Sequence, residues 1–104
     1  MKHPKLTLSE AAAADILDQA DWYEQQSGLT LAKRWEGAAT SAILRILDHP
    51  RSGAVSKFSH AELANVRRVS IVGFPKHLIF YQLRPAEILV LRIVHGARDL
   101  EHLF

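Results

Sequence analysis

The second half of the chain carries most of the side chains that could do chemistry, and these are mainly cations. Five basic residues form the candidate binding set: Arg67, Arg68, Lys76, Arg92 and Arg98. Residues 49–104 hold eight Lys and Arg against four Asp and Glu, whereas residues 1–48 hold five against seven. A cationic surface attracts either nucleic-acid phosphates or the carboxylates of an acidic protein. We therefore expect the second half of the chain to bind an anionic partner.

The six histidines are the other candidates for chemistry. His77 and His95 lie at the ends of predicted strands, near basic residues, so they could act as an acid–base pair. A lone strand histidine more often satisfies a backbone group in a half-buried position, and we prefer this interpretation. The other histidines lack the paired spacing of a zinc site, and the chain has no cysteine. With no phosphate-binding loop, dinucleotide fingerprint or catalytic carboxylate pair, the sequence predicts neither a metal nor a cofactor.

Length and composition indicate one compact domain over residues 1–104. A chain of 104 residues suits a single hydrophobic core. No apolar run approaches the ~20 residues of a membrane-spanning helix. The first residues lack the apolar segment and cleavage site of a secretory signal. Because the absence of cysteine also agrees with a reducing compartment, we expect a cytoplasmic protein without membrane contact.

Short apolar runs from Val66 onwards predict three strands that position the basic residues. They are rich in Val, Ile, Leu and Phe, and turn residues separate them at 73–75 and 84–86. This spacing favours an antiparallel meander over helices, which need longer uninterrupted periods. Alternate residues of a strand point to opposite faces of the sheet, so the register decides which of Arg67 and Arg68 joins the other cations. The sequence leaves that choice open.

The first half of the chain predicts a short strand followed by a helix. The segment Lys5–Leu8 is typical of an extended strand, and Ser9 follows it as a helix N-cap. Gly28 supplies the C-terminal end of the helix. One apolar stripe at helical spacing predicts its buried face: Ala13, Ile16, Leu17, Ala20 and Tyr23.

A second helix completes a predicted helical hairpin. It starts near Thr30 and ends by His49, because Pro50 follows. Its predicted inner face consists of Leu31, Trp35, Ala38, Ala42 and Ile46. The stretch from Pro50 to Asn65 is typical of a connection and could hold a short turn of helix.

Together these elements predict an α+β fold. A helical hairpin packs on one face of a mostly antiparallel four-stranded sheet that includes the N-terminal strand, and a short helical turn ends the chain. The opposite, concave face carries one of the paired arginines, with Lys76 and Arg92 among apolar neighbours. We expect the apolar residues of segment 100–104 to fold back over the sheet, which would set Arg98 at the rim of the basic face.

Four fragments carry a resemblance to a known family. They are DWYEQQ at the end of the first helix, LDHPRSG after the second, VRRVSIVGFPKHLIFYQL over the first pair of strands, and ILVLRIVHGARDLEHLF to the end. In this order and at these spacings they resemble the RelE/ParE toxin superfamily over nearly the whole chain, and within it the ParE branch. The resemblance implies a plasmid stabilization toxin of a type II toxin–antitoxin system.

The superfamily contains two activities, and the residues favour one of them. RelE-like members are ribosome-dependent mRNA endonucleases, which combine a cationic cluster with an acid–base group near the C-terminus. Here Arg67 or Arg68 and Arg98 match the arginines, but the tyrosine position falls at Phe104 and the lysine-rich stretch is reduced to Lys57. ParE-like members inhibit DNA gyrase and need no catalytic group. The resemblance thus implies a gyrase inhibitor, with an mRNA endonuclease or a non-toxic relic that only binds its antitoxin as alternatives.

The resemblance also implies a protein partner. Family antitoxins dimerise through a DNA-binding domain and wrap a C-terminal segment over the toxin, so we expect a hetero-oligomer with a cognate antitoxin. A disordered segment can cover a large groove and add a helix or a strand to its target. An acidic segment would match the basic half of this chain. The resemblance implies no sequence-specific nucleic-acid binding by the toxin itself.

Overall fold

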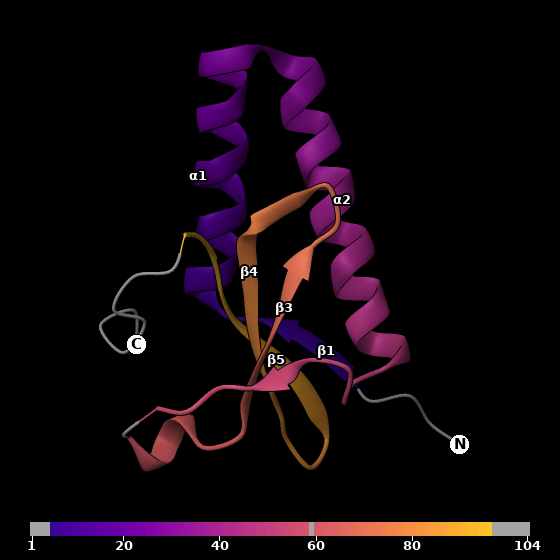
Figure 1. The fold of residues 1–104 in the computed structure, drawn as a ribbon, viewed down its shortest axis with the longest axis vertical. Helices are drawn as coiled ribbons and strands as arrows, with labels where there is room; N and C mark the ends of the chain where they lie inside the picture. The colour runs from indigo at the N-terminus through magenta and orange to yellow at the C-terminus, as the bar shows by residue number, and fades with distance from the viewer. Residues whose placement is uncertain (1–4, 59, 97–104) are drawn as a thin grey trace.

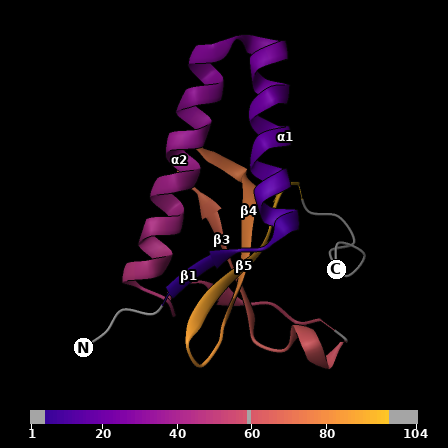
Figure 2. The same cartoon turned by 180° about the vertical axis from the view of Figure 1, so that it is seen from behind.

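The computed structural model describes residues 5–58 and 60–96, which form two layers (Figure 1). Eight elements follow one another along the chain: β1 (Lys5–Leu8), α1 (Glu10–Ser27), α2 (Leu29–Asp48), β2 (Ala54–Val55), the 3₁₀ helix η1 (Ala61–Leu63), β3 (Val66–Ile71), β4 (Phe74–Leu83) and β5 (Glu87–His95). The two long helices form an antiparallel hairpin on one side of the sheet, as the view from behind also shows (Figure 2). The predicted α+β fold is confirmed.

Local sequence signals account for the helical hairpin. The Ser9 hydroxyl accepts a hydrogen bond from the Ala12 amide at 3.0 Å, which makes Ser9 the N-cap of α1. The same hydroxyl donates to the Leu91 carbonyl at 2.8 Å and so ties the start of α1 to β5. Gly28 separates the helices with a φ of 92°, a conformation that glycine adopts without steric cost.

The buried face of α2 agrees with the predicted stripe, whereas that of α1 is rotated. Trp35, Ala42 and Ile46 are almost fully buried in the helix-side core. Three residues of the predicted α1 stripe also pack against this core: Ile16, Ala20 and Tyr23. However, Ala12 takes the innermost position and Leu17 is 67% exposed. The four consecutive alanines at 11–14 leave the phase of the apolar stripe undetermined, because each can face either the core or solvent.

The sheet has five strands in the order β1-β5-β4-β3-β2. The parallel pairing of β1 with β5 joins the two ends of the described chain, and the other pairs are antiparallel. The predicted count of four strands was one too low, because the two-residue strand β2 lies in the stretch that we expected to be a connection. Two residues carry no alternating pattern, so the sequence could not indicate β2. The short helical turn predicted for that stretch is η1.

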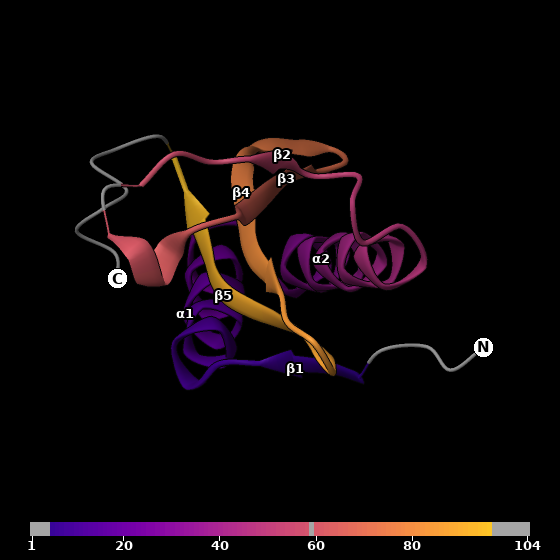
Figure 3. The ribbon, with the colours of Figure 1, turned by 90° about the horizontal axis from the view of Figure 1, so that it is seen from below.

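Two cores lie on opposite faces of the sheet. The larger core fills the space between the helical hairpin and the sheet, and contains Trp35, Ile79 and Tyr81. A smaller core on the other face, here called the outer face, contains Leu63, Val66 and Phe80. Seen from below, β2 lies at the end of the sheet away from α1 (Figure 3), and Phe58 and Leu63, from the segment that follows β2, pack in the outer-face core. The segment from β2 to β3 therefore covers part of the outer face and leaves the rest open.

Candidate functional site

The strand register decides between the two adjacent arginines of β3. Arg68 pairs with Phe80 of β4, which belongs to the outer-face core, whereas Arg67 pairs with Tyr81, which belongs to the helix-side core. Residues directly opposite each other in an antiparallel pair share a face of the sheet. Arg68 therefore lies on the outer face, where it is exposed.

Arg68 and Lys76 line the same hollow on the outer face. This outer-face pocket has a volume of about 610 Å³, and its lining residues are Arg68, Ser70, Pro75, Lys76, Leu78 and Gly96. Both cations are exposed, whereas Leu78 is half-buried and packs on the outer-face core. The pocket thus combines two positive charges and a hydroxyl with an apolar surface. Such a lining can bind an anionic group that carries apolar neighbours.

The Arg67 side chain binds the loop that follows α2. Its Nη1 atom donates to the carbonyl oxygens of Arg51, at 3.1 Å, and Gly53, at 2.8 Å. The buried Tyr81 hydroxyl holds the same loop by donating to the Pro50 carbonyl and accepting from the Gly53 amide, at 2.8 and 2.9 Å. We call this loop, residues 50–53, the latched loop. Arg67 therefore positions the latched loop. We had predicted Arg67 as a residue that binds a partner, and the sequence did not indicate this structural role.

Arg92 is also engaged within the protein. Its Nε and Nη2 atoms donate to the two carboxylate oxygens of Asp15 on α1, at 2.8 and 2.9 Å. Asp15 in addition accepts the backbone N–H of Ile93 at 2.9 Å. The pair lies beside a β-bulge, where Phe80 is opposite Arg92 and the next residue, Tyr81, is opposite Val90. A bulge re-aims side chains, and here Arg92 binds α1 and does not line the outer-face pocket. Its predicted role in binding a partner stays a prediction, and within the protein its guanidinium is paired with Asp15.

The two strand histidines lie on the side of α1. His77 is 2% exposed and shares a 2.9 Å hydrogen bond between its Nε2 atom and the Tyr23 hydroxyl. Its ring also contacts Trp35 and His95, with centroids 5.5 and 4.7 Å apart. Burial, and to a smaller extent the charge of His95, lowers the pKa of His77 to about 4. Such a group stays neutral at physiological pH. It differs from the half-buried, backbone-bonded histidine that we expected, because it is fully buried and its partner is the Tyr23 side chain. His95 is exposed and lines a hollow with Gln19 and Trp22.

The predicted site includes residues beyond those that line the outer-face pocket. Arg98 and the tail that ends in Phe104 lie outside the described residues. Lys57 is exposed and does not line the outer-face pocket. Within residues 5–58 and 60–96, no group of three His, Asp or Glu side chains could hold a metal ion. Across the same ranges, no helix has the length and apolar character to cross a membrane.

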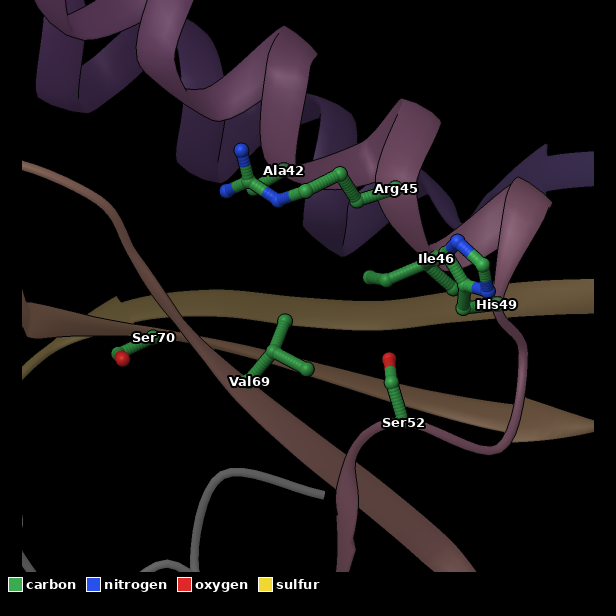
Figure 4. A pocket seen from close by; sticks show the side chains of 7 residues that line it. All are labelled: Ala42, Arg45, Ile46, His49, Ser52, Val69 and Ser70. Carbon is green, nitrogen blue, oxygen red and sulfur yellow. The ribbon is translucent and has the colours of Figure 1, made fainter.

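Another hollow lies between α2 and the edge of the sheet (Figure 4). This α2–β3 groove has a volume of about 220 Å³ and is lined by Ala42, Arg45, Ile46, His49, Ser52, Val69 and Ser70. Sequence reasoning did not single it out, because its residues come from three separate segments. The one available signal was the LDHPRSG fragment, which contributes His49 and Ser52.

Comparison with known proteins identifies the family. The family model of the ParE toxin of the type II toxin–antitoxin system parDE matches residues 6–100. The chain belongs to the ParE toxin family. Among solved structures, this ParE-family chain is similar to one described as the chromosomal ParDE TA system from P. aeruginosa, with 19% identity and a TM-score of 0.76. The match covers 91% of this chain and 98% of the other, and it supports the fold. A search of curated protein sequences finds no match.

Proposed function

We propose that this ParE-family protein is a cytoplasmic toxin that inhibits DNA gyrase through a recognition surface and is neutralised by a cognate antitoxin. The observation that carries the proposal is the lining of the outer-face pocket. Two cations, Arg68 and Lys76, stand beside the apolar Leu78, and the histidines of the neighbouring strand ends face α1 instead. This lining suits the binding of an anionic surface.

The chemistry of RNA cleavage gives the reason to prefer inhibition over catalysis. A nuclease must remove the proton of a 2′-hydroxyl and protonate the leaving oxygen, which requires groups that exchange protons near neutral pH. Among the described lining residues of the outer-face pocket, the titratable side chains are an arginine and a lysine. Phe104, at the tyrosine position of RelE-like members, carries no exchangeable proton.

The same surface supports the proposed antitoxin. An acidic segment would meet Arg68 and Lys76 on the outer face, and its apolar side chains would meet Leu78. Covering this pocket would remove it from the gyrase-binding surface. Neutralisation then follows from steric competition and needs no change in the fold of the toxin.

Two assays with purified protein test the proposal. Gyrase, supercoiled plasmid and ATP should yield linear DNA after protein digestion when the toxin is present, because the cleaved complex is trapped. The gene product encoded beside the toxin should suppress this signal when added in equal amount. The same toxin incubated with programmed ribosomes should leave the mRNA intact. Position-specific cuts in that mRNA, without linear plasmid in the first assay, would instead identify an endonuclease.

A further inference from the structure

The first strand, β1, forms one edge of the sheet. Among the described elements it pairs with β5 on one side, and its other side has no neighbouring strand. Seen from below, no described element lies beyond β1 on the side away from β5 (Figure 3). An unpaired edge presents backbone donors and acceptors that can pair with another chain. A further strand can therefore be added at β1.

The backbone groups on the free side of β1 belong to Leu6 and Leu8. The Ser9 amide donates to the Val90 carbonyl at 2.9 Å, so Ser9 directs its backbone groups towards β5. These groups alternate in direction along a strand, so those of Thr7 also point to β5, and those of Leu6 and Leu8 point away from it. The free side thus offers the N–H and C=O groups of two leucines.

The side chains of β1 leave an apolar position open at the same edge. Leu6 packs against the helix-side core, and Leu8 points to the same face of the strand. Leu8 is nevertheless 36% exposed. Thr7 points to the opposite face, and its hydroxyl donates to a Glu87 carboxylate oxygen of β5 at 3.0 Å. A strand added at this edge would cover Leu8 if it brought an apolar side chain to the helix side.

We propose that a second copy of this chain supplies that strand, and that the two β1 edges pair antiparallel about a two-fold axis. Leu6 of one copy then lies opposite Leu8 of the other, and Thr7 lies on the axis opposite the second Thr7. This register uses both N–H and both C=O groups that each copy offers. It also places each Leu8 beside a Leu6 on the helix side, where the two cores become continuous.

The residues at the two ends of β1 favour this register over its neighbours. A shift has to be by two residues, because a shift by one would turn the apolar side chains to the wrong face. In one direction it would place Leu8 opposite Pro4, which has no backbone N–H. In the other direction it would place Leu6 opposite Glu10, the first residue of α1. Both shifts lose backbone hydrogen bonds.

The charges beside β1 also match those of a second copy. In the proposed register Lys5 lies opposite Ser9 of the other copy, directly before Glu10. Lys5 and Glu10 are both exposed, and the axis repeats this pair of opposite charges at the other end of the joined strands. Both outer-face pockets then lie on the side of the joined sheet away from the helical hairpins. The dimer goes beyond the proposed function and does not depend on it.

A single cysteine on the axis tests the register. The chain has no cysteine, so Thr7→Cys introduces one thiol per copy. Cβ atoms directly opposite each other are about 4.5–5.5 Å apart, which a small adjustment brings to disulfide geometry. In Lys5→Cys, the matched control, the two thiols would be separated by roughly 13 Å along the strands. During mild oxidation, Thr7→Cys should form a covalent dimer at least about 10-fold faster than Lys5→Cys on a non-reducing gel.

Hydrogen exchange of the wild-type protein tests the dimer without any substitution. Dimerisation follows mass action, so the Leu8 amide should exchange at least about 5-fold more slowly at ~1 mM than at ~10 µM protein. The Ser9 amide, which already donates to Val90, is the internal control and should change less than about 2-fold. Equal oxidation rates of the two cysteine variants would overturn the dimer, and so would a Leu8 exchange rate that does not depend on concentration. Neither result would affect the gyrase or antitoxin proposals.

Discussion

The ion pair between Asp15 and Arg92 gives the sharpest test of how the structure assigns the basic residues. Asp15 receives three hydrogen bonds, two from the Arg92 guanidinium and one from the Ile93 amide, all between 2.8 and 2.9 Å. These bonds fasten α1 to the part of β5 that β1 does not reach. Asp15→Ala removes all three and leaves a partly buried guanidinium without this carboxylate.

The expected loss of stability follows from the burial of the pair. A hydrogen bond to a charged group contributes about 1.5–3 kcal/mol when it is well buried, and a bond between neutral groups about 1 kcal/mol. The side chains of Arg92 and Asp15 are 23% and 14% exposed, so solvent screens part of this interaction. We therefore expect Asp15→Ala to lower the free energy of unfolding by about 2–3 kcal/mol. For a domain of this size, that corresponds to a decrease in Tm of about 10–20 °C.

Urea unfolding followed by tryptophan fluorescence measures this change, because Trp35 is buried in the helix-side core. Asp18→Ala is the matched control: Asp18 is exposed about one turn further along α1, and its loss should cost less than about 0.5 kcal/mol. Arg92→Ala should also destabilise the protein, and the double variant with Asp15→Ala should lose less than the sum of the two. Equal stabilities for Asp15→Ala and Asp18→Ala would refute the reasoning and return Arg92 to the candidate binding set.

Three further predictions concern the pocket, the latched loop and the aromatic cluster. Replacing Arg68 and Lys76 together by Ala should reduce growth arrest at least about 10-fold in a viability assay without lowering Tm, whereas Arg84→Ala, in the exposed β4–β5 turn, should leave toxicity intact. Tyr81→Phe should lower the free energy of unfolding by about 1–3 kcal/mol, measured with urea, because two backbone groups of the latched loop lose their partner. The pKa of His77 is lowered to about 4 from an unfolded value near 6.5, so its contribution is fully present above pH 6.5 and is lost as the pH falls towards 4. Unfolding curves should therefore lose stability between pH 6.5 and 5 in the wild type, by up to about 3 kcal/mol in total by pH 4, and a His77→Gln variant should lack this slope.

The elements of the fold were largely predictable, because their signals are local. Ser9, Gly28 and Pro50 mark helix boundaries through their own backbone chemistry, and the apolar runs of β3 to β5 have the length of strands. β2 was missed because its pairing with β3 depends on the latched loop, which brings Ala54 opposite Arg68. The sequence of a two-residue strand carries no pattern from which that contact could be predicted.

The candidate site was only partly predictable. Contacts between segments far apart in the sequence decide which basic residues are engaged within the protein and which line the pocket. Arg68 and Lys76 share a pocket as expected of the basic face. Arg67 differs from Arg68 only in strand register, yet it binds carbonyl groups 14 and 16 residues away. Arg92 is taken up by a carboxylate 77 residues earlier in the chain, at a bulge that shifts the alternation of β5. Neither partner can be predicted from residue type and spacing along one strand, because both lie in distant segments of the chain.

The position of β5 in the sheet has a consequence for how the protein is made. This strand comes last among the described elements, yet it lies between β1 and β4 and is the neighbour that joins them. A ribosome that has not yet reached Glu87 has produced both helices and four strands, but β1 has no strand to pair with. Closing the sheet requires contacts between the two ends of the sequence, which are slow to form. A message broken before this codon therefore yields a fragment in which β1 and β4 lack the strand that joins them, so the sheet cannot be completed.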